Sequence, residues 1–115
     1  MAKEPPKAPP SAKRDCIKAF TPALVDYTND VVYGDLWERK GLSKRDRSLI
    51  TVAALVATYR PEQLVSHLSR GIANGVTQEE ITEVITHMAF YAGWPAAMSA
   101  AQVAYTVLVE GNKGE

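Results

Sequence analysis

The chain has 115 residues, of which 46% are hydrophobic, and this size and composition are those of one globular domain with a single core. Its 13 basic and 13 acidic residues leave a formal net charge of zero. No overall field would therefore attract the protein to nucleic acid or to an anionic membrane surface, and neither partner is expected.

The N-terminal segment, residues 1–13, is rich in proline and charge and has no bulky apolar residue after Met1. Such a segment cannot join a packed core, so a disordered tail is expected there, followed by one domain over residues 14–111. The segment also lacks the apolar run of a secretory signal, and the lone Cys16 fits a reducing compartment. A cytoplasmic protein is expected.

The first predicted helix begins at Asp15, which can act as its N-cap. Pro22 fits poorly inside this helix and could instead start the helix, in its first turn. Residues 33–35, Tyr-Gly-Asp, predict a break, followed by a short helical turn at 36–37 that ends at Gly41. The apolar positions recur at helical spacing, at Ile17, Phe20, Leu24, Tyr27 and Val31.

The next predicted helix, residues 43–59, is the most apolar part of the chain. Ser43 can cap it, with Asp46 three residues further on in a weaker form of the capping box. From Leu49 to Ala57 the only polar residue is Thr51, so this helix is expected to be covered by protein on every side. Because a membrane span needs about 20 apolar residues, the segment predicts a central core helix rather than a span.

Three further helices follow, joined by short turns. Proline in the Arg60-Pro61 pair suits a helix start, and Gly75 can take the left-handed C-terminal cap of that helix. Thr77 and Glu80 have the spacing of a full capping box, which predicts the next helix start. A break at 93–95 leads into a last helix that ends near Glu110 and is stopped by glycine. With no strand-like alternation, the sequence predicts an all-α fold of antiparallel helix pairs.

The helix that begins at Pro61 carries the strongest candidate site. Because a helix turns by 100° per residue, four polar residues of this helix fall on one stripe. An apolar stripe formed by Leu64, Leu68 and Ile72 lies beside it. A solvated helix surface would explain polar residues, yet this stripe lacks the Lys and Glu that are usual on exposed faces. A histidine placed there can exchange a proton near neutral pH. The polar stripe consists of Gln63, His67, Arg70 and Asn74.

Arg45 and Arg47 could be plain surface charges. Cations at a helix start are electrostatically unfavourable unless an anion or a carboxylate accompanies them, which favours an anionic ligand there. Tyr33 and Trp94 adjoin glycine breaks, where aromatic residues can line a pocket or cap a core. His87 follows Glu83 by four residues, and a surface ion pair explains it.

Several classes of site are excluded by the sequence. It contains no glycine-rich phosphate loop, no Cys-x-x-Cys, no pair of histidines at metal-ligand spacing and no serine in a nucleophile elbow. Cys16 has no local base beside it. A metal site is therefore not expected.

Several segments, taken together and in their order along the chain, resemble the carboxymuconolactone decarboxylase family. The resemblance covers about residues 20–109. The resemblance implies an AhpD-like all-α fold, assembly into homotrimers or homohexamers with sites near subunit contacts, and a role in the catabolism of aromatic compounds. The segments are Tyr33-Gly34, RDRSLITVAALVA, QLVSHL, NGVTQEEITEVI and YAGWPAAMSA.

The resemblance leaves two chemistries to be weighed. The alkylhydroperoxidase branch uses a redox Cys-x-x-Cys with a His four residues after the second cysteine and a Glu upstream. Aligning His67 with that His places Arg60 and Gln63 at the cysteine positions and Ser48 at the position of the Glu. Without a thiolate there is no sulfenate or disulfide cycle, so peroxidase activity remains only the alternative.

The decarboxylase branch implies a small anionic substrate, a lactone bearing two carboxylates, and no cofactor. By this resemblance Arg47 and Arg70 would bind the anionic groups, His67 would donate the proton, and Asn74 or Tyr33 would orient the lactone, with Trp94 also in the substrate site. Ser48 stands where many relatives have a Glu, which keeps a third possibility open, a non-catalytic assembly or small-ligand-binding subunit.

Overall fold

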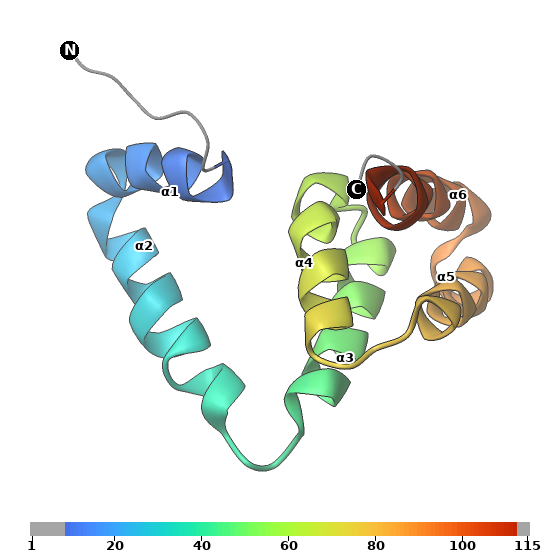
Figure 1. Ribbon diagram of the computed structural model, residues 1–115, viewed down its shortest axis with the longest axis horizontal. Helices are drawn as coiled ribbons and strands as arrows, with labels where there is room; N and C mark the ends of the chain where they lie inside the picture. Colours follow the sequence, from blue (N-terminus) through green and yellow to red (C-terminus); the bar gives the residue numbers. More distant parts are fainter. Residues whose placement is uncertain (1–8, 113–115) are drawn as a thin grey trace. The chain divides into compact units, whose positions relative to one another are not determined.

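The computed structural model describes residues 9–112, and the side chains of residues 15–111 (Figure 1). The described backbone is helical and contains no strand, so the all-α prediction is confirmed. The chain divides into two compact units, residues 1–41 and 42–115. None of the described helices is long and apolar enough to span a membrane.

The first unit contains α1 (Pro9–Phe20), α2 (Pro22–Tyr27), the π-helical turn η1 (Thr28–Tyr33) and the 3₁₀ turn η2 (Leu36–Glu38). The alternative expected for Pro22 is confirmed, since it stands in the first turn of α2. The expected start at Asp15 is wrong because α1 already begins at Pro9. Residues 1–8 of the expected disordered tail lie outside the described residues, and residues 9–13 belong to α1.

Helical spacing did not identify the buried residues of the first unit. The apolar residues predicted to form one face, from Ile17 to Val31, are all exposed, whereas Val25 is buried. Trp37 in η2 is also buried, and the ring of Tyr33 packs against it with 5.9 Å between centroids. The buried centre described for this unit therefore lies around α2 and η2 rather than along the predicted stripe.

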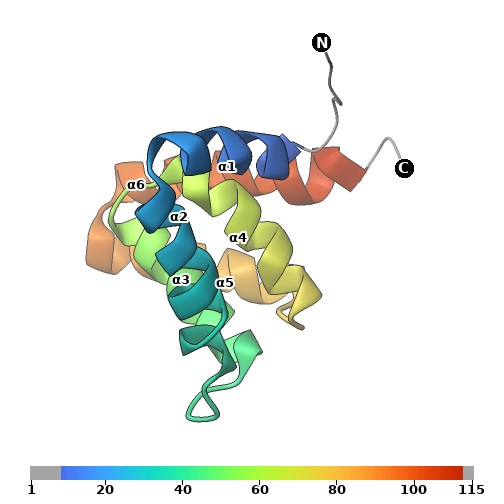
Figure 2. The ribbon, with the colours of Figure 1, turned by 90° about the vertical axis from the view of Figure 1, so that its left-hand side faces the viewer.

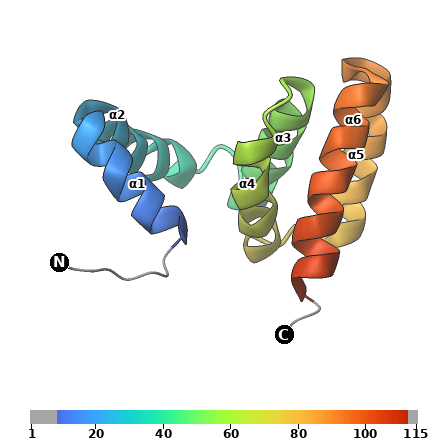
Figure 3. The same ribbon diagram turned by 90° about the horizontal axis from the view of Figure 1, so that it is seen from above.

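The second unit contains α3 (Lys44–Ala57), α4 (Pro61–Ala73), α5 (Gln78–Ala92) and α6 (Trp94–Ala104). Beyond α6 the chain continues in η3 (Tyr105–Val109) and η4 (Glu110–Asn112), so the last helix passes the predicted stop at Gly111. α3 pairs with α4 and α5 pairs with α6, side by side and joined by short turns (Figure 3). α6 also packs against α4, passing across it in Figure 2.

The core of this unit draws on all four helices, and α3 is buried along the line of Ser48, Val52 and Val56. Within the single described chain α3 is not covered on every side, because Ile50 is 56% exposed and Ala54 is also exposed. The other helices of the unit thus leave one apolar face of α3 open. The other core residues are Leu64, Leu68, Val76, Ile81, Ile85, Ala89, Ala97, Ala100, Ala104 and Leu108.

α3 and α4 end in the same backbone motif, with a residue of positive φ after the last turn. Gly75 takes this position after α4, with φ 104°, as predicted. After α3 the position is held by Tyr59, with φ 58°. Its N–H donates to the Val56 carbonyl at 3.2 Å and the Arg60 N–H donates to the Leu55 carbonyl at 2.9 Å, which is the Schellman pattern. Because glycine is the usual signal for this cap, the sequence did not predict Tyr59 there.

The predicted capping box at the start of α5 is confirmed. The Thr77 Oγ1 accepts from the Glu80 N–H at 3.1 Å, and Glu80 Oε1 accepts from the Thr77 N–H at 3.0 Å. Thr77→Ala should therefore destabilise the protein by about 1 kcal/mol in urea unfolding, since it removes the acceptor of a helix N–H group. Thr86→Ala, at an exposed position in the same helix, is the control and should cost less. If both variants lose the same free energy of unfolding, the capping box adds nothing to stability.

Candidate functional site

The polar stripe predicted on α4 is present and lies beside buried residues. His67, Arg70 and Asn74 are half-buried, whereas Gln63 is exposed. Leu64 and Leu68 are buried as predicted, but Ile72 is 42% exposed and Gly71 takes the next buried position. α4 is therefore anchored by Leu64, Leu68 and Gly71, and this anchoring holds three polar side chains at the boundary between core and solvent.

The electrostatic environment of His67 favours the neutral imidazole. Burial lowers the pKa of His67 below its ordinary value, and the positive charge of Arg70 lowers that pKa further. The Nδ1 atom of His67 is shielded from solvent. In the free protein at neutral pH this residue is thus an uncharged group that can accept a proton, with a cation one helical turn away.

Ser48 joins the polar stripe from α3. It is 1% exposed, and its Oγ accepts a hydrogen bond from Asn74 Nδ2 at 3.0 Å. The two helices meet closely here, because a Cβ built on Gly71 would lie 3.7 Å from the Cβ of Ser48. The sequence identified Ser48 only as a departure from the family pattern. Its contact with Asn74 was missed because helical periodicity does not show which residues meet across two helices.

The two arginines at the start of α3 differ in their surroundings. Arg45 binds the carboxylate of Glu80 and that of Asp46, the latter at 3.2 Å between Nη1 and Oδ1. Arg45 thus has the carboxylate partner that a cation at a helix start needs, and it gives no support to an anionic ligand. The hydrogen bond from the Thr77 backbone lowers the pKa of Glu80, and Arg45 lowers it further. Arg47 is half-buried and directly precedes Ser48, so it remains the candidate anion contact on α3.

Two aromatic residues, Tyr33 and Trp94, were also predicted in the site. Tyr33 belongs to the first unit and packs against Trp37. Trp94 is the first residue of α6, is 56% exposed and packs edge-to-face on Phe90, with 5.2 Å between centroids.

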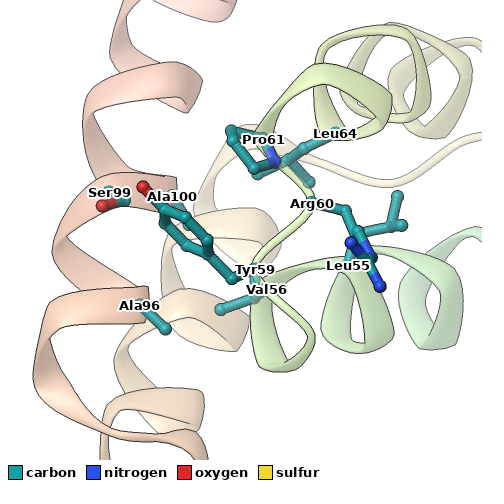
Figure 4. A pocket seen from close by; sticks show the side chains of 9 residues that line it. All are labelled: Leu55, Val56, Tyr59, Arg60, Pro61, Leu64, Ala96, Ser99 and Ala100. Atoms are coloured by element: carbon teal, nitrogen blue, oxygen red, sulfur yellow. The ribbon is translucent and has the colours of Figure 1, made fainter.

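The start of α6 lies near the end of α3, as the lining of a small cavity shows (Figure 4). The cavity, of about 10 Å³, has room for about one water molecule. With a rise of 1.5 Å per residue, its α3 residues lie about 12 Å along the helix from Ser48. Trp94 is therefore not brought beside Asn74 within one chain. The cavity is lined by Leu55, Val56, Tyr59, Arg60, Pro61, Leu64, Ala96, Ser99 and Ala100.

Two larger surface cavities of the second unit are mainly apolar. One of about 350 Å³ lies between α5 and the helix formed by α6 and η3, and one of about 440 Å³ lies between α3 and α5. His87 lines the second cavity and stacks on Tyr91 with 4.7 Å between ring centroids. Neither cavity is lined by His67, Arg70 or Asn74. Among the described residues, no group of three or more His, Cys, Asp or Glu side chains could hold a metal ion.

Comparison with known proteins gives a family match over most of the chain. The model of the carboxymuconolactone decarboxylase family matches residues 22–106. The chain is 38% identical over 88 residues to the 4-carboxymuconolactone decarboxylase of Acinetobacter baylyi, covering 76% of this chain and 66% of that protein. It is 33% identical over 81 residues to the nitrosuccinic acid decarboxylase of Metarhizium robertsii, covering 70% of this chain and 57% of that protein.

A third relative is an uncharacterized 15.0 kDa protein of Paracoccus denitrificans, with 31% identity over 80 residues, covering 68% of this chain and 60% of that protein. The match thus spans less than two thirds of the length of each of these three relatives. All the candidate residues, from Tyr33 to Trp94, lie inside the range matched by the family model.

Proposed function

The chain belongs to the carboxymuconolactone decarboxylase family, and on that premise we propose that it is a cofactor-independent carboxy-lyase. Its substrate would be a small carboxylated lactone of the 4-carboxymuconolactone type or a related cyclic acid. The observation that carries the proposal is the half-buried stripe of α4, where a neutral His67 lies beside the cation of Arg70. Asn74 follows on the same stripe and is held by Ser48.

The proposed reaction breaks the bond between the ring and one carboxylate. The electron pair of that bond passes into the ring and onto the lactone oxygen, and carbon dioxide leaves. A proton then adds to carbon and quenches the charge. Such a reaction requires cations that hold the carboxylates, a donor near the developing oxyanion and an acid. In this proposal Arg47 and Arg70 bind the carboxylates, Asn74 or Tyr33 orients the lactone, and His67 supplies the proton.

The lowered pKa of His67 makes proton donation depend on substrate binding. In the free protein Arg70 disfavours the imidazolium, so His67 is neutral at neutral pH. A substrate carboxylate that binds Arg70 offsets this positive charge and adds a negative charge near the imidazole. Both changes raise the pKa of His67, because they favour its charged form. His67 would thus take up a proton when the anionic substrate binds and donate it after carbon dioxide has left.

The proposal includes assembly of the chain into a homotrimer or homohexamer, in an AhpD-like arrangement with the site near a subunit contact. Two features support it. The apolar face of α3 around Ile50 is open in a single chain, and so are Phe90 and Trp94 around the turn between α5 and α6. If a second chain brought its Trp94 to the α4 stripe, the predicted substrate contacts would come from two subunits.

The direct test is an assay of carbon dioxide release. The purified chain, with no added metal or cofactor, is incubated with 4-carboxymuconolactone and with related carboxylated lactones. Release of one equivalent of carbon dioxide from any of them, undiminished by Cys16→Ser, is expected. The alternative, dithiol peroxidase activity, is assayed with a hydroperoxide and a dithiol reductant. Peroxide consumption that depends on Cys16, without decarboxylation, would replace the proposal by that alternative.

A further inference from the structure

The turn between α4 and α5, residues 74–77, is attached to α3 at both of its ends. At its start, Asn74 donates to Ser48 at 3.0 Å. At its end, the Thr77 N–H donates to the carboxylate of Glu80, and that carboxylate also binds the guanidinium of Arg45. Arg45 and Ser48 are three residues apart in α3, which places them on neighbouring turns of one helix face.

The aliphatic part of Arg45 also approaches this turn. Its Cδ lies 4.0 Å from the position that a Cβ on Gly75 would occupy. Val76, the next residue, is 3% exposed, and its N–H donates to the Gly71 carbonyl at 2.9 Å. Arg45 therefore spans the outside of the turn, from the start of α3 to the start of α5.

The surroundings of Arg45 distinguish it from the cations proposed to bind substrate. Its guanidinium already contacts two carboxylates, those of Glu80 and Asp46. The Arg45 and Glu80 side chains are 36% and 40% exposed, and ion pairs at such exposed sites contribute little to stability. Loss of this pair would thus leave the fold intact while freeing the second attachment of the turn.

We infer that Arg45 is a positioning residue for the proposed decarboxylation. By holding the 74–77 turn against α3, it keeps the Asn74 carboxamide on Ser48 and in one orientation toward a substrate at His67. The inference rests on the proposed function, since Asn74 matters to turnover only if the substrate binds along the α4 stripe. Arg45 itself does not touch the substrate.

The test is a double-mutant cycle on kcat/KM with Arg45→Met, Asn74→Ala and the double variant. Arg45→Met should lower kcat/KM about tenfold, because a displacement of 1 Å in a positioning group can cost up to about a hundredfold. In the Asn74→Ala background it should have no further effect. Lys44→Met, which removes the same charge from the same helix start, should lower kcat/KM less. Equal losses from Arg45→Met in both backgrounds would overturn the inference.

A second measurement needs no substrate. In NMR spectra of the ¹⁵N-labelled protein, the side-chain NH₂ protons of Asn74 should exchange with water faster in Arg45→Met than in the parent chain or in Lys44→Met. Unchanged exchange would show that Arg45 does not hold Asn74, whatever the enzyme does. If the parent chain decarboxylates no lactone, the proposed function fails, and the exchange rates still decide whether Arg45 holds this turn.

Discussion

Replacing His67 by alanine is expected to lower kcat for decarboxylation by about three orders of magnitude, within the range that general acid–base groups contribute. The fold should survive, because the residues that anchor α4 to the core are Leu64, Leu68 and Gly71 rather than His67. Steady-state kinetics gives the loss. Thermal unfolding and size-exclusion chromatography of the same sample report whether the fold and the assembly are retained.

The matched control for this prediction is the second histidine of the chain. His87 is exposed and stacks on Tyr91, away from the α4 stripe, so His87→Ala should retain kcat. His67→Gln, which keeps a polar side chain but cannot exchange a proton, should be as inactive as His67→Ala. A His67→Ala variant that turns over at nearly the parental rate would remove this residue from the mechanism.

Arg70→Met is expected to change both the kinetics and the titration of His67. The substitution keeps a long side chain and removes one charge-assisted contact to a substrate carboxylate, worth about 1.5–3 kcal/mol, so kcat/KM should fall about ten- to a hundredfold. The pKa of His67 should rise in the free variant, because the positive charge of Arg70 lowers it in the parent chain. NMR titration of the imidazole measures that change.

The control for Arg70→Met is Arg60→Met. Arg60 is exposed and lies beside the small cavity at the far end of α3, so its loss removes one charge from the same unit without removing a proposed substrate contact. It should leave both kcat/KM and the pKa of His67 nearly unchanged. If the two variants lose kcat/KM equally, Arg70 contributes only through the net charge of the protein.

Local signals in the sequence predicted the second unit well. The Ser43 cap, the proline at the start of α4 and the box of Thr77 with Glu80 each act within one turn, and all are present in the structure. The all-α class follows from the same signals. The left-handed Tyr59 was missed because its conformation is held by backbone hydrogen bonds at the end of α3 and is not signalled by its residue type.

The candidate site could be predicted only along one helix. A turn of 100° per residue places His67, Arg70 and Asn74 on one stripe without knowledge of the fold. The contact between Asn74 and Ser48 joins residues 26 positions apart, and the contact between Arg45 and Glu80 joins residues 35 positions apart. Such contacts depend on how helices pack, which periodicity does not give.

In the first unit the apolar residues recur at helical spacing, yet those side chains are exposed and Val25 is buried. Spacing places Ile17 and Leu24 on one helix face, but the structure divides them between α1 and α2. Spacing also does not show whether another element of the chain covers such a face. Trp94 was considered for the site because it adjoins a glycine break, a local signal that does not show which helix ends meet. Within one chain the start of α6 lies near the end of α3.

The pKa of His67, measured by NMR with and without a bound ligand, tests the central claim most directly. Its imidazole signals are assigned by their absence in His67→Ala, and the ligand is a non-reactive lactone analogue that carries two carboxylates. The proposed site predicts a pKa below the ordinary 6.5 in the free protein and a clear rise when the analogue is bound, with a smaller rise in Arg70→Met. A pKa that stays the same at saturating analogue would show that the anionic ligand does not bind beside His67, and would contradict the proposed mechanism.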